Sequence, residues 1–323
     1  MTMIPLPEQF KLAQYRLTLK ALEPLHLPEF KGSALRGGFG HTFKRLVCAQ
    51  PDACDKACRL NNRCPYGYIF ETSPPADSEV LRNFREVPRA FVIQPASDRR
   101  TEIAAGEQLV FHLTLVGQGI QYLPYFIAVF RELGYQGFGR SRGRYRLQTV
   151  EAVSAIDRNV EPIYQADDDA IHNASFPLTG LDIEAYARQW SGDRLRLNFV
   201  TPTRLKHRGR WIEDGPPFEV LVKTLLGRVS SLSYFHCGQL FEADFRGLID
   251  RAATVAIEAS DTRWQDWSRF SGRQKRRIEM GGLAGCVTYA GDVAPYLPLL
   301  ALGQFIHVGK GTVFGNGQYR INA

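Results

Sequence analysis

A glycine-rich, basic segment, Gly134-Tyr135-Gln136-Gly137-Phe138-Gly139-Arg140-Ser141-Arg142-Gly143-Arg144-Tyr145-Arg146, has a counterpart near the end of the chain, Gly309-Lys310-Gly311-Thr312-Val313-Phe314-Gly315-Asn316-Gly317-Gln318-Tyr319-Arg320. Each follows an apolar run with helical spacing and leads into a strand-like stretch. Glycine lets the backbone approach a ligand closely and adopt positive φ, and consecutive exposed N–H groups bind anions. Two such segments predict a duplicated fold that holds an extended polyanion.

The order of elements before the first glycine-rich segment predicts a ferredoxin-like domain. Strands are expected where apolar residues alternate or cluster, and helices where they recur every three to four residues. The expected order is a strand at 15–22, a helix at 33–48, strands at 89–94 and 108–116, a helix at 122–133 and a strand at 145–150. This is the β-α-β-β-α-β pattern of ferredoxin-like folds.

The second half of the chain repeats that order. Its expected elements are a strand at 194–199 that 201–205 extends, a helix at 217–235, strands at 254–258 and 285–289, a helix at 296–305 and a strand at 318–322. The predicted fold class is α+β, with two tandem ferredoxin-like domains. We expect an N-terminal domain at 1–150 with a cysteine-bearing insertion at 48–70, a link at 151–190 and a C-terminal domain at 191–323.

The first helix has a clear apolar face, formed by Leu35, Phe39, Phe43 and Leu46-Val47. Ser33 is the expected N-cap, because a serine side chain can accept from the first free N–H groups of a helix. With Phe39 and Phe43 turned to the core, His41 should project outward.

Charge is modest in total but clustered. The chain has 40 Lys and Arg against 33 Asp and Glu, a net charge of +7. The basic clusters lie at 140–146, 204–210 and 273–277. Basic stripes favour a nucleic-acid partner, and the alternative for any one cluster is a solvated surface. No segment is apolar and long enough to cross a membrane, and no secretory signal is evident, so we expect a cytoplasmic protein.

Four cysteines lie close together in the first half, at Cys48, Cys54, Cys58 and Cys64. Four thiolates near one another in sequence can form a tetrahedral site for zinc, and iron–sulfur clusters use the same ligands. Free thiols or two disulfides are the alternatives, and an intracellular location argues against disulfides. We expect a structural zinc site without a catalytic role, since four protein ligands leave no open position.

An ordered set of motifs resembles the CRISPR-associated endoribonucleases that process precursor CRISPR RNA, within the RAMP superfamily. The motifs are Gly32-Ser33-Ala34-Leu35-Arg36-Gly37-Gly38-Phe39-Gly40, the cysteines ending in Cys64-Pro65-Tyr66-Gly67-Tyr68-Ile69-Phe70-Glu71, Tyr122-Leu123-Pro124-Tyr125-Phe126, Arg269-Phe270-Ser271-Gly272-Arg273-Gln274-Lys275-Arg276, Gly281-Gly282-Leu283-Ala284-Gly285, and His307-Val308-Gly309-Lys310-Gly311-Thr312-Val313-Phe314-Gly315. They run over nearly the whole chain.

The resemblance implies two RNA-recognition-type domains and metal-independent cleavage within CRISPR repeats. The 2′-hydroxyl would attack the adjacent phosphate and leave 2′,3′-cyclic phosphate and 5′-hydroxyl ends, releasing mature guide RNAs. The partners implied are repeat RNA and subunits of an interference complex. The alternative is a non-catalytic RAMP subunit that only binds RNA. A phosphate-binding metabolic enzyme is disfavoured, because strands rather than helices follow both glycine-rich segments.

RNA self-cleavage needs a base, an acid and cations, and histidine, lysine and arginine suit these roles. His41 is the first catalytic candidate, since members of the family commonly use a histidine in this region, and Lys44 lies on the same helix face. His307, beside Lys310, is the second candidate, and its alternative role is to fix the loop by hydrogen bonds. The expected RNA-binding residues are Arg36, Arg140, Arg142, Arg144, Lys275, Arg276, Lys310, Gly309, Gly311, Gly315 and Gly317.

Overall fold

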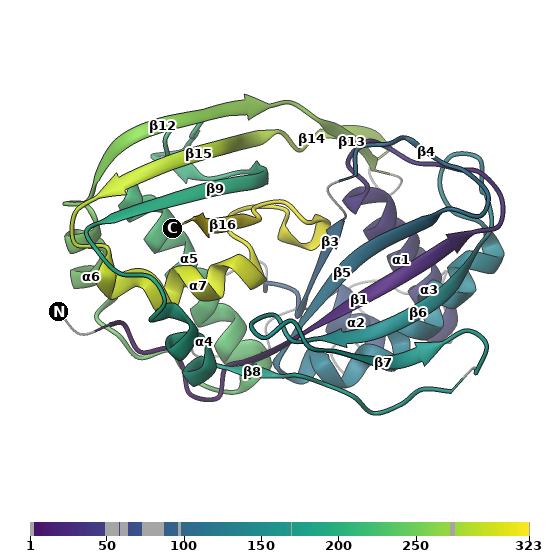
Figure 1. Cartoon of the computed structure of the whole chain (residues 1–323). Coiled ribbons are helices and arrows are strands. Elements are labelled where there is room, and N and C mark those ends of the chain that lie inside the picture. The colour runs from purple at the N-terminus through teal and green to yellow at the C-terminus, as the bar shows by residue number, and fades with distance from the viewer. Residues whose placement is uncertain are drawn as a thin grey trace. The chain divides into compact units, whose positions relative to one another are not determined.

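A computed structural model describes residues 3–48, 58, 64–72, 87–95, 98–168, 170–271 and 275–322 (Figure 1). The chain divides into two compact units. The N-terminal unit comprises Lys11–Pro177 and Phe235–Cys237, and the C-terminal unit comprises Met1–Phe10, Leu178–Tyr234 and Gly238–Ala323. Each unit is described by itself below.

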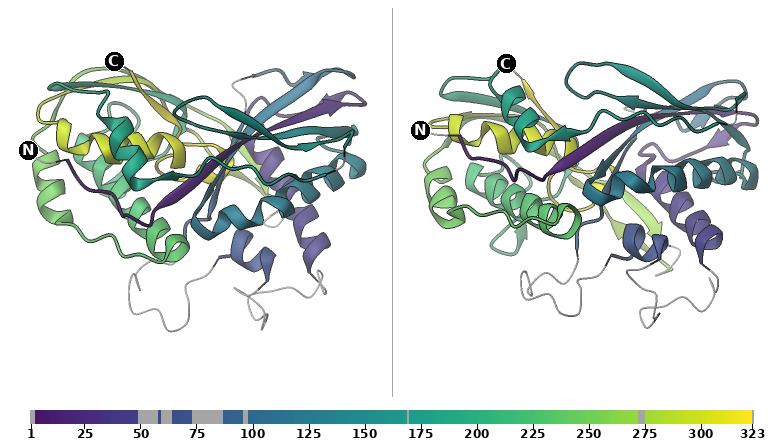
Figure 2. Two further views of the ribbon diagram at one scale, coloured as in Figure 1. Left: turned by 60° about the horizontal axis from the view of Figure 1, so that its bottom comes forward. Right: turned by 90° about the horizontal axis from the view of Figure 1, so that it is seen from below.

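The N-terminal unit is a ferredoxin-like fold. Its elements follow in the order β1 (Lys11–Ala21), α1 (Gly32–Val47), β3 (Phe91–Pro95), β5 (Gln108–Val116), α3 (Leu123–Gln136) and β6 (Tyr145–Val153). The strands form an antiparallel sheet in the order β3-β5-β1-β6, which β7 (Val160–Gln165) continues beside β6. The helices α1, α3 and α2 (Pro65–Phe70) cover one face of this sheet (Figure 2).

The C-terminal unit has the same topology. Its elements are β9 (Arg194–Thr203), α5 (Phe218–Leu232), β12 (Ala256–Gln265), β15 (Gly282–Ala290), α7 (Leu297–Ile306) and β16 (Tyr319–Asn322). The sheet order β12-β15-β9-β16 matches β3-β5-β1-β6 strand for strand, and all pairs are antiparallel. The predicted α+β fold of two tandem ferredoxin-like units is therefore confirmed.

Shorter elements complete both units. The N-terminal unit has β2 (Leu25–His26), β4 (Glu102–Ile103) and a 3-10 helix (Gly117–Tyr122). The C-terminal unit has β8 (Leu178–Thr179), α4 (Gly180–Ala187), β10 (Lys206–His207), β11 (Arg210–Trp211), α6 (Phe245–Ala252), β13 (Ser268–Ser271), β14 (Arg276–Glu279) and 3-10 helices at Ala294–Tyr296 and Thr312–Phe314. A π-helical turn (Ser233–Cys237) follows α5. Residues 151–190, expected to be a link, hold the end of β6 together with β7, β8 and α4.

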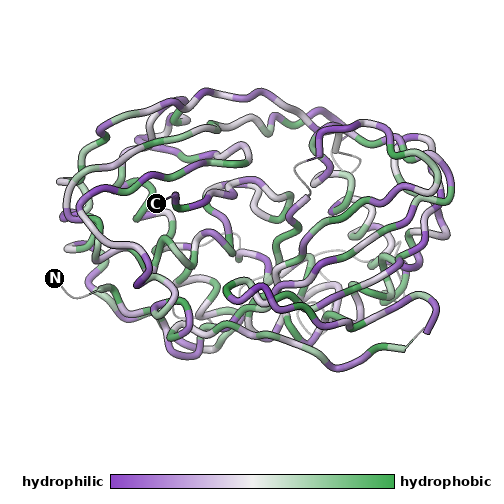
Figure 3. The backbone as a smooth tube through the Cα atoms, in the orientation of Figure 1, coloured by the Kyte–Doolittle hydropathy of each residue, from purple (hydrophilic) through white to green (hydrophobic). Residues whose placement is uncertain are grey.

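Burial along the strands follows their place in the sheet. Within the C-terminal sheet, the central strand β9 alternates between buried and exposed residues over most of its length. The edge strand β12 is exposed along most of its length and is largely hydrophilic in Figure 3. A polar edge strand resists pairing with other chains, because its unpaired backbone groups are flanked by hydrophilic side chains.

An aromatic cluster forms the core between α1, α3 and the N-terminal sheet. The ring of Phe39 is fully buried and stacks on Phe126 with ring centroids 4.4 Å apart. Leu35 and Phe43 are also fully buried, as the helical spacing predicts. The prediction for Leu46 was wrong, because this residue lies in the last turn of α1, where the described neighbours leave 49% of it exposed.

Candidate nucleic-acid interface

The helix α1 presents His41 to solvent. Phe39 and Phe43 on either side of it are buried in the core, so helical geometry turns the imidazole outward, and His41 is exposed. Lys44 follows three residues later and is partly buried. The guanidinium of Arg36, an expected phosphate contact, lies 4.1 Å from the centroid of the Phe70 ring, where a cation–π interaction holds it.

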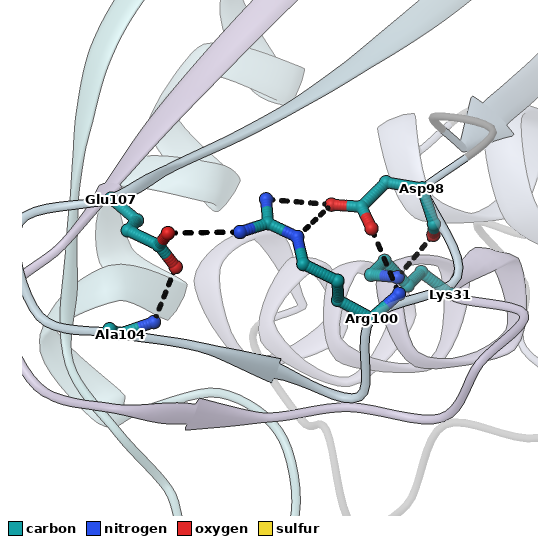
Figure 4. Close-up of polar contacts among 5 residues, drawn as sticks. All are labelled: Lys31, Asp98, Arg100, Ala104 and Glu107. Atoms are coloured by element: carbon teal, nitrogen blue, oxygen red, sulfur yellow. Dashed lines mark hydrogen bonds and ion pairs between the residues drawn. The ribbon is translucent and has the colours of Figure 1, made fainter.

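A buried lysine anchors the start of this helix (Figure 4). Lys31, rather than the predicted Ser33, occupies the N-cap position, and no side chain caps the helix there. Lys31 is 1% exposed, and its Nζ donates to the backbone oxygen of Asp98 over 2.5 Å. Burial lowers the pKa of Lys31. The hydrogen bond ties α1 to a segment far along the chain and so fixes the direction in which the helix carries His41.

Asp98 is itself held by a short polar chain. Its carboxylate accepts from the Arg100 Nε over 2.9 Å, and this hydrogen bond is the main cause of its lowered pKa. The guanidinium of Arg100 reaches Glu107 at 2.9 Å, and Glu107 in turn accepts from the N–H of Ala104 over 2.8 Å (Figure 4). Because this network lies largely at the surface, its ion pairs add little to the stability of the fold. Its main role is to orient the segment at Asp98 that accepts the hydrogen bond from Lys31.

The first glycine-rich loop packs tightly on the segment that carries β2. A Cβ at Gly139 would lie 2.5 Å from the backbone oxygen of His26, and glycine is required there also because φ is +79°. The N–H groups of Phe138 and Arg140 donate to the carbonyls of Gly143 and His26, both over 2.9 Å. These two N–H groups already have acceptors within the protein and cannot bind an anion in this conformation. The loop therefore lacks the continuous row of free N–H donors that was expected.

The arginines of this loop differ in what they offer to a ligand. Arg140 and Arg142 are exposed, and their guanidinium groups have no ionic partner among the residues that the structure describes. Arg144 instead pairs with Glu23 at 2.7 Å, and this contact lowers the pKa of the Glu23 carboxyl. Two of the three predicted arginines are thus available cations, whereas the third already has a carboxylate beside it.

The second glycine-rich loop is folded onto the end of β9. Four glycines, Gly309, Gly311, Gly315 and Gly317, have positive φ, which other residues rarely adopt. The N–H of Lys310 donates to the oxygen of Arg204 over 3.1 Å. The side chain of Lys310 is exposed. The glycines therefore allow the loop to turn closely against the sheet while it presents a lysine outward.

His307 lies at the buried end of this loop. It is 0% exposed, and its Nδ1 lies 3.1 Å from the backbone oxygen of Asn316, to which it must donate. Its Nε2 is buried without a hydrogen-bond partner among the described residues. Burial lowers the pKa of His307 to about 3, so the ring is neutral. An imidazole in this position holds the loop and reaches no ligand at the surface in this conformation.

Three cation–aromatic pairs lie at or near the second loop. The guanidinium of Arg204 and the Nζ of Lys206 lie 4.2 and 4.4 Å from the centroid of the Trp211 ring, on and beside the β10–β11 hairpin. The guanidinium of Arg269 lies 4.7 Å from the Phe314 ring. Burial lowers the pKa values of both arginines, which remain cationic. Trp211 was missed in the sequence, although it directly follows the basic cluster at 204–210.

The backbone at Glu279 and Met280 connects Arg204 with the second glycine-rich loop. Arg204 Nη1 donates to the oxygen of Glu279 over 2.5 Å, and Asn316 Nδ2 donates to the oxygen of Met280 over 3.3 Å. Lys275 and Arg276, predicted to bind RNA, are exposed on and beside β14. The C-terminal unit therefore gathers cations and aromatic rings around the second loop, a combination suited to a nucleic-acid strand.

The cysteine cluster is only partly within the described residues. Cys48, Cys58 and Cys64 form no disulfide there, and Cys64 Sγ accepts from the N–H of Gly67 over 3.1 Å. Cys54 lies outside the described residues. In the described part of the chain, no three His, Cys, Asp or Glu side chains converge as metal ligands. The zinc prediction is therefore untested. None of the described helices has the length and apolar character needed to cross a bilayer.

Comparisons with known proteins bear on both units. A family model described only as an N-terminal domain matches residues 10–176, and the model of the CRISPR-associated endoribonuclease Cas6 matches residues 197–319. An uncharacterized protein of Archaeoglobus fulgidus is 23% identical over 199 residues, which are 61% of this chain and 63% of that protein. The matched part of this chain therefore spans less than two thirds of that relative.

Two solved structures are similar over nearly the full chain. One is a Cas6 product complex, with a TM-score of 0.57 and 14% identity over 96% of this chain and 99% of that one. The other is Thermus thermophilus Cas6, with a TM-score of 0.54 and 14% identity over 97% and 99%. At this level of identity the likeness establishes the shared fold.

Proposed function

We propose that this chain, whose residues 197–319 match the family model of the CRISPR-associated endoribonuclease Cas6 and whose fold is that of Cas6, cleaves precursor CRISPR RNA within the repeats and releases mature guide RNAs. The observation that carries the proposal for this chain is the exposed imidazole of His41 on the first helix of a ferredoxin-like unit. A further proposal is that the product RNA passes to subunits of an interference complex.

The proposed reaction is a transesterification that requires no metal ion. A base takes the proton of a 2′-hydroxyl, and the 2′-oxygen forms a bond to the adjacent phosphorus. The bond from phosphorus to the 5′-oxygen breaks, and an acid protonates that oxygen. The products are a 2′,3′-cyclic phosphate and a 5′-hydroxyl, so atoms and charge balance without an external reactant.

Within this reaction we assign proton transfer to His41. An imidazole can accept and donate protons near neutral pH, and its exposure on α1 allows direct contact with RNA. Lys44, three residues later, would stabilise the charged phosphorane. We assign His307 a positioning role, because its ring is 0% exposed and is hydrogen-bonded within the second loop.

RNA binding is proposed to rest on the cations of both glycine-rich loops. Contacts from arginine and lysine to phosphates set the register of the strand without reading its sequence. The residues proposed for these contacts are Arg36, Arg140, Arg142, Arg144, Lys275, Arg276 and Lys310, with Gly309, Gly311, Gly315 and Gly317 shaping the second loop. Arg140 and Arg142 carry the most weight, since no carboxylate neutralises them among the described residues.

A structural zinc ion held by Cys48, Cys54, Cys58 and Cys64 remains a separate proposal. The three described cysteines form no disulfide, as thiolate ligands require. The metal would stabilise the insertion and would take no part in catalysis.

The test uses CRISPR repeat RNA in EDTA, with a single 2′-deoxy substitution placed at each position in turn. We expect cleavage that one deoxy position abolishes, and loss of cleavage but not of binding in His41→Ala. His172→Ala, which removes another exposed histidine of the N-terminal unit, is the matched control. Tight binding without a cut at any position would instead identify a non-catalytic RAMP subunit.

A further inference from the structure

Gly37 differs from the other glycines inside α1. A Cβ at Gly38 would lie 2.8 Å from Leu133 Cδ2, and a Cβ at Gly40 would overlap the ring of Phe70, so core packing explains both residues. Apart from its two chain neighbours and the nearby helix backbone, a Cβ at Gly37 would have no heavy atom within 4 Å. Glycine in a helix interior is less stable than alanine, so the fold gives no reason for glycine at this exposed position.

The open position lies next to His41. Residues four apart share one face of a helix, and helical side chains lean toward the N-terminus, so the imidazole of His41 extends over the turn that contains Gly37. Even so, no atom of that imidazole comes within 4 Å of the point where a Cβ of residue 37 would lie. The point that a side chain at residue 37 would occupy is therefore open, and the imidazole does not cover it.

We propose that Gly37 keeps this space open for the RNA strand, with the ribose that carries the reactive 2′-hydroxyl lying between the α1 backbone and His41. The inference rests on the proposed function and deepens it, since it identifies where the reactive nucleotide lies. A ribose is small and polar, and it can approach a helix surface closely only where no side chain projects. Gly37 thereby determines whether substrate reaches the imidazole.

A second helical glycine also has open space where a Cβ would lie, and it provides a matched control. Gly227, in the interior of α5, also has no heavy atom within 4 Å of the point that a Cβ would occupy, but it belongs to the C-terminal unit and carries no histidine one turn further along. Alanine should fit both positions without a clash. Gly37→Ala and Gly227→Ala should therefore raise the melting temperature equally, by about 1–3 °C, through helix propensity.

Cleavage should separate the two variants. Under single-turnover conditions with repeat RNA, we expect Gly37→Ala to cut roughly tenfold more slowly than the unmodified chain and Gly37→Leu about a hundredfold more slowly, because small displacements of a reacting group have effects of this order. Gly227→Ala should cut at the unmodified rate. The combination of a more stable protein with a slower reaction is not expected of a residue with a merely structural role.

The inference is overturned if the unmodified chain cuts the RNA and Gly37→Leu cuts it equally fast. Failure of the proposed function has a different signature, namely an unmodified chain that never cuts. In that case the affinity for uncleaved repeat RNA tests the inference. If RNA lies against Gly37, the leucine side chain should displace it, and Gly37→Leu should bind more weakly than the unmodified chain. Equal affinity of the two proteins would again overturn the inference.

Discussion

The buried imidazole of His307 makes the stability of the C-terminal unit depend on pH. Its pKa is lowered from 6.5 to about 3, first by burial and also by the nearby charge of Arg228. The folded state therefore binds fewer protons than the unfolded state between these values. The contribution of the neutral ring is fully present above pH 6.5 and is lost as the pH falls toward 3.

The size of the effect follows from the two pKa values. At pH 6 the unfolded state gains about 0.8 kcal/mol from protonation of this residue, and at pH 5 about 2 kcal/mol, whereas the folded state gains almost nothing. Because His307 is 0% exposed, solvent does not screen this effect. A loss of about 2 kcal/mol is a substantial part of the stability of an ordinary domain.

Urea unfolding at several pH values between 7.5 and 5 measures this loss. His307→Asn is the informative variant, since the asparagine amide can still donate toward the backbone oxygen of Asn316 but does not titrate. Any constant cost of the substitution cancels when each protein is compared with itself at pH 7.5. The unmodified chain should lose about 2 kcal/mol more than the variant by pH 5. Parallel curves for the two proteins would refute a buried neutral imidazole at position 307.

Two further experiments test the binding surface and the core. Replacing both Arg140 and Arg142 by alanine should weaken RNA binding and reduce the slope of log K against log salt by about 1.4, while Arg144→Ala, which removes an arginine already paired with Glu23, should change the slope less. Equal slopes for all three proteins would remove this loop from the interface. Phe39→Ala should lower the free energy of unfolding by about 3–5 kcal/mol, because it empties the centre of the aromatic cluster, and a loss below about 1 kcal/mol in urea titration would contradict that packing.

The order of strands and helices was predictable because it depends on local periodicity. The strand predicted at 108–116 coincides with β5, and the helix predicted at 33–48 differs from α1 by one residue at each end. Elements without a regular apolar pattern were predicted less accurately. The edge strand β12 extends from Ala256 to Gln265, well beyond the predicted 254–258, since a mostly exposed strand lacks the apolar pattern on which the prediction depends.

The candidate site was predictable only in part. Helical spacing around Phe39 and Phe43 was enough to turn His41 outward, and its exposure confirms this. The same reasoning could not place His307, whose burial depends on contacts with Asn316 nine residues later in the chain. It also could not detect the Trp211 pairs, because the β10–β11 hairpin brings that ring against Lys206 of its partner strand and against Arg204, two residues before that strand.

The amino-acid sequence by itself determined the two β-α-β-β-α-β repeats and the outward direction of His41, because apolar periodicity specifies which face of each element is buried. Only the tertiary structure decided which basic groups remain available and which glycines leave open space. Arg142 and Arg144 look alike in sequence, yet among the residues that the structure describes only Arg144 meets a carboxylate, that of Glu23. Gly37 and Gly38 are adjacent, yet only Gly38 is packed against Leu133. Partners of this kind come from distant parts of the chain, and folding alone brings them together.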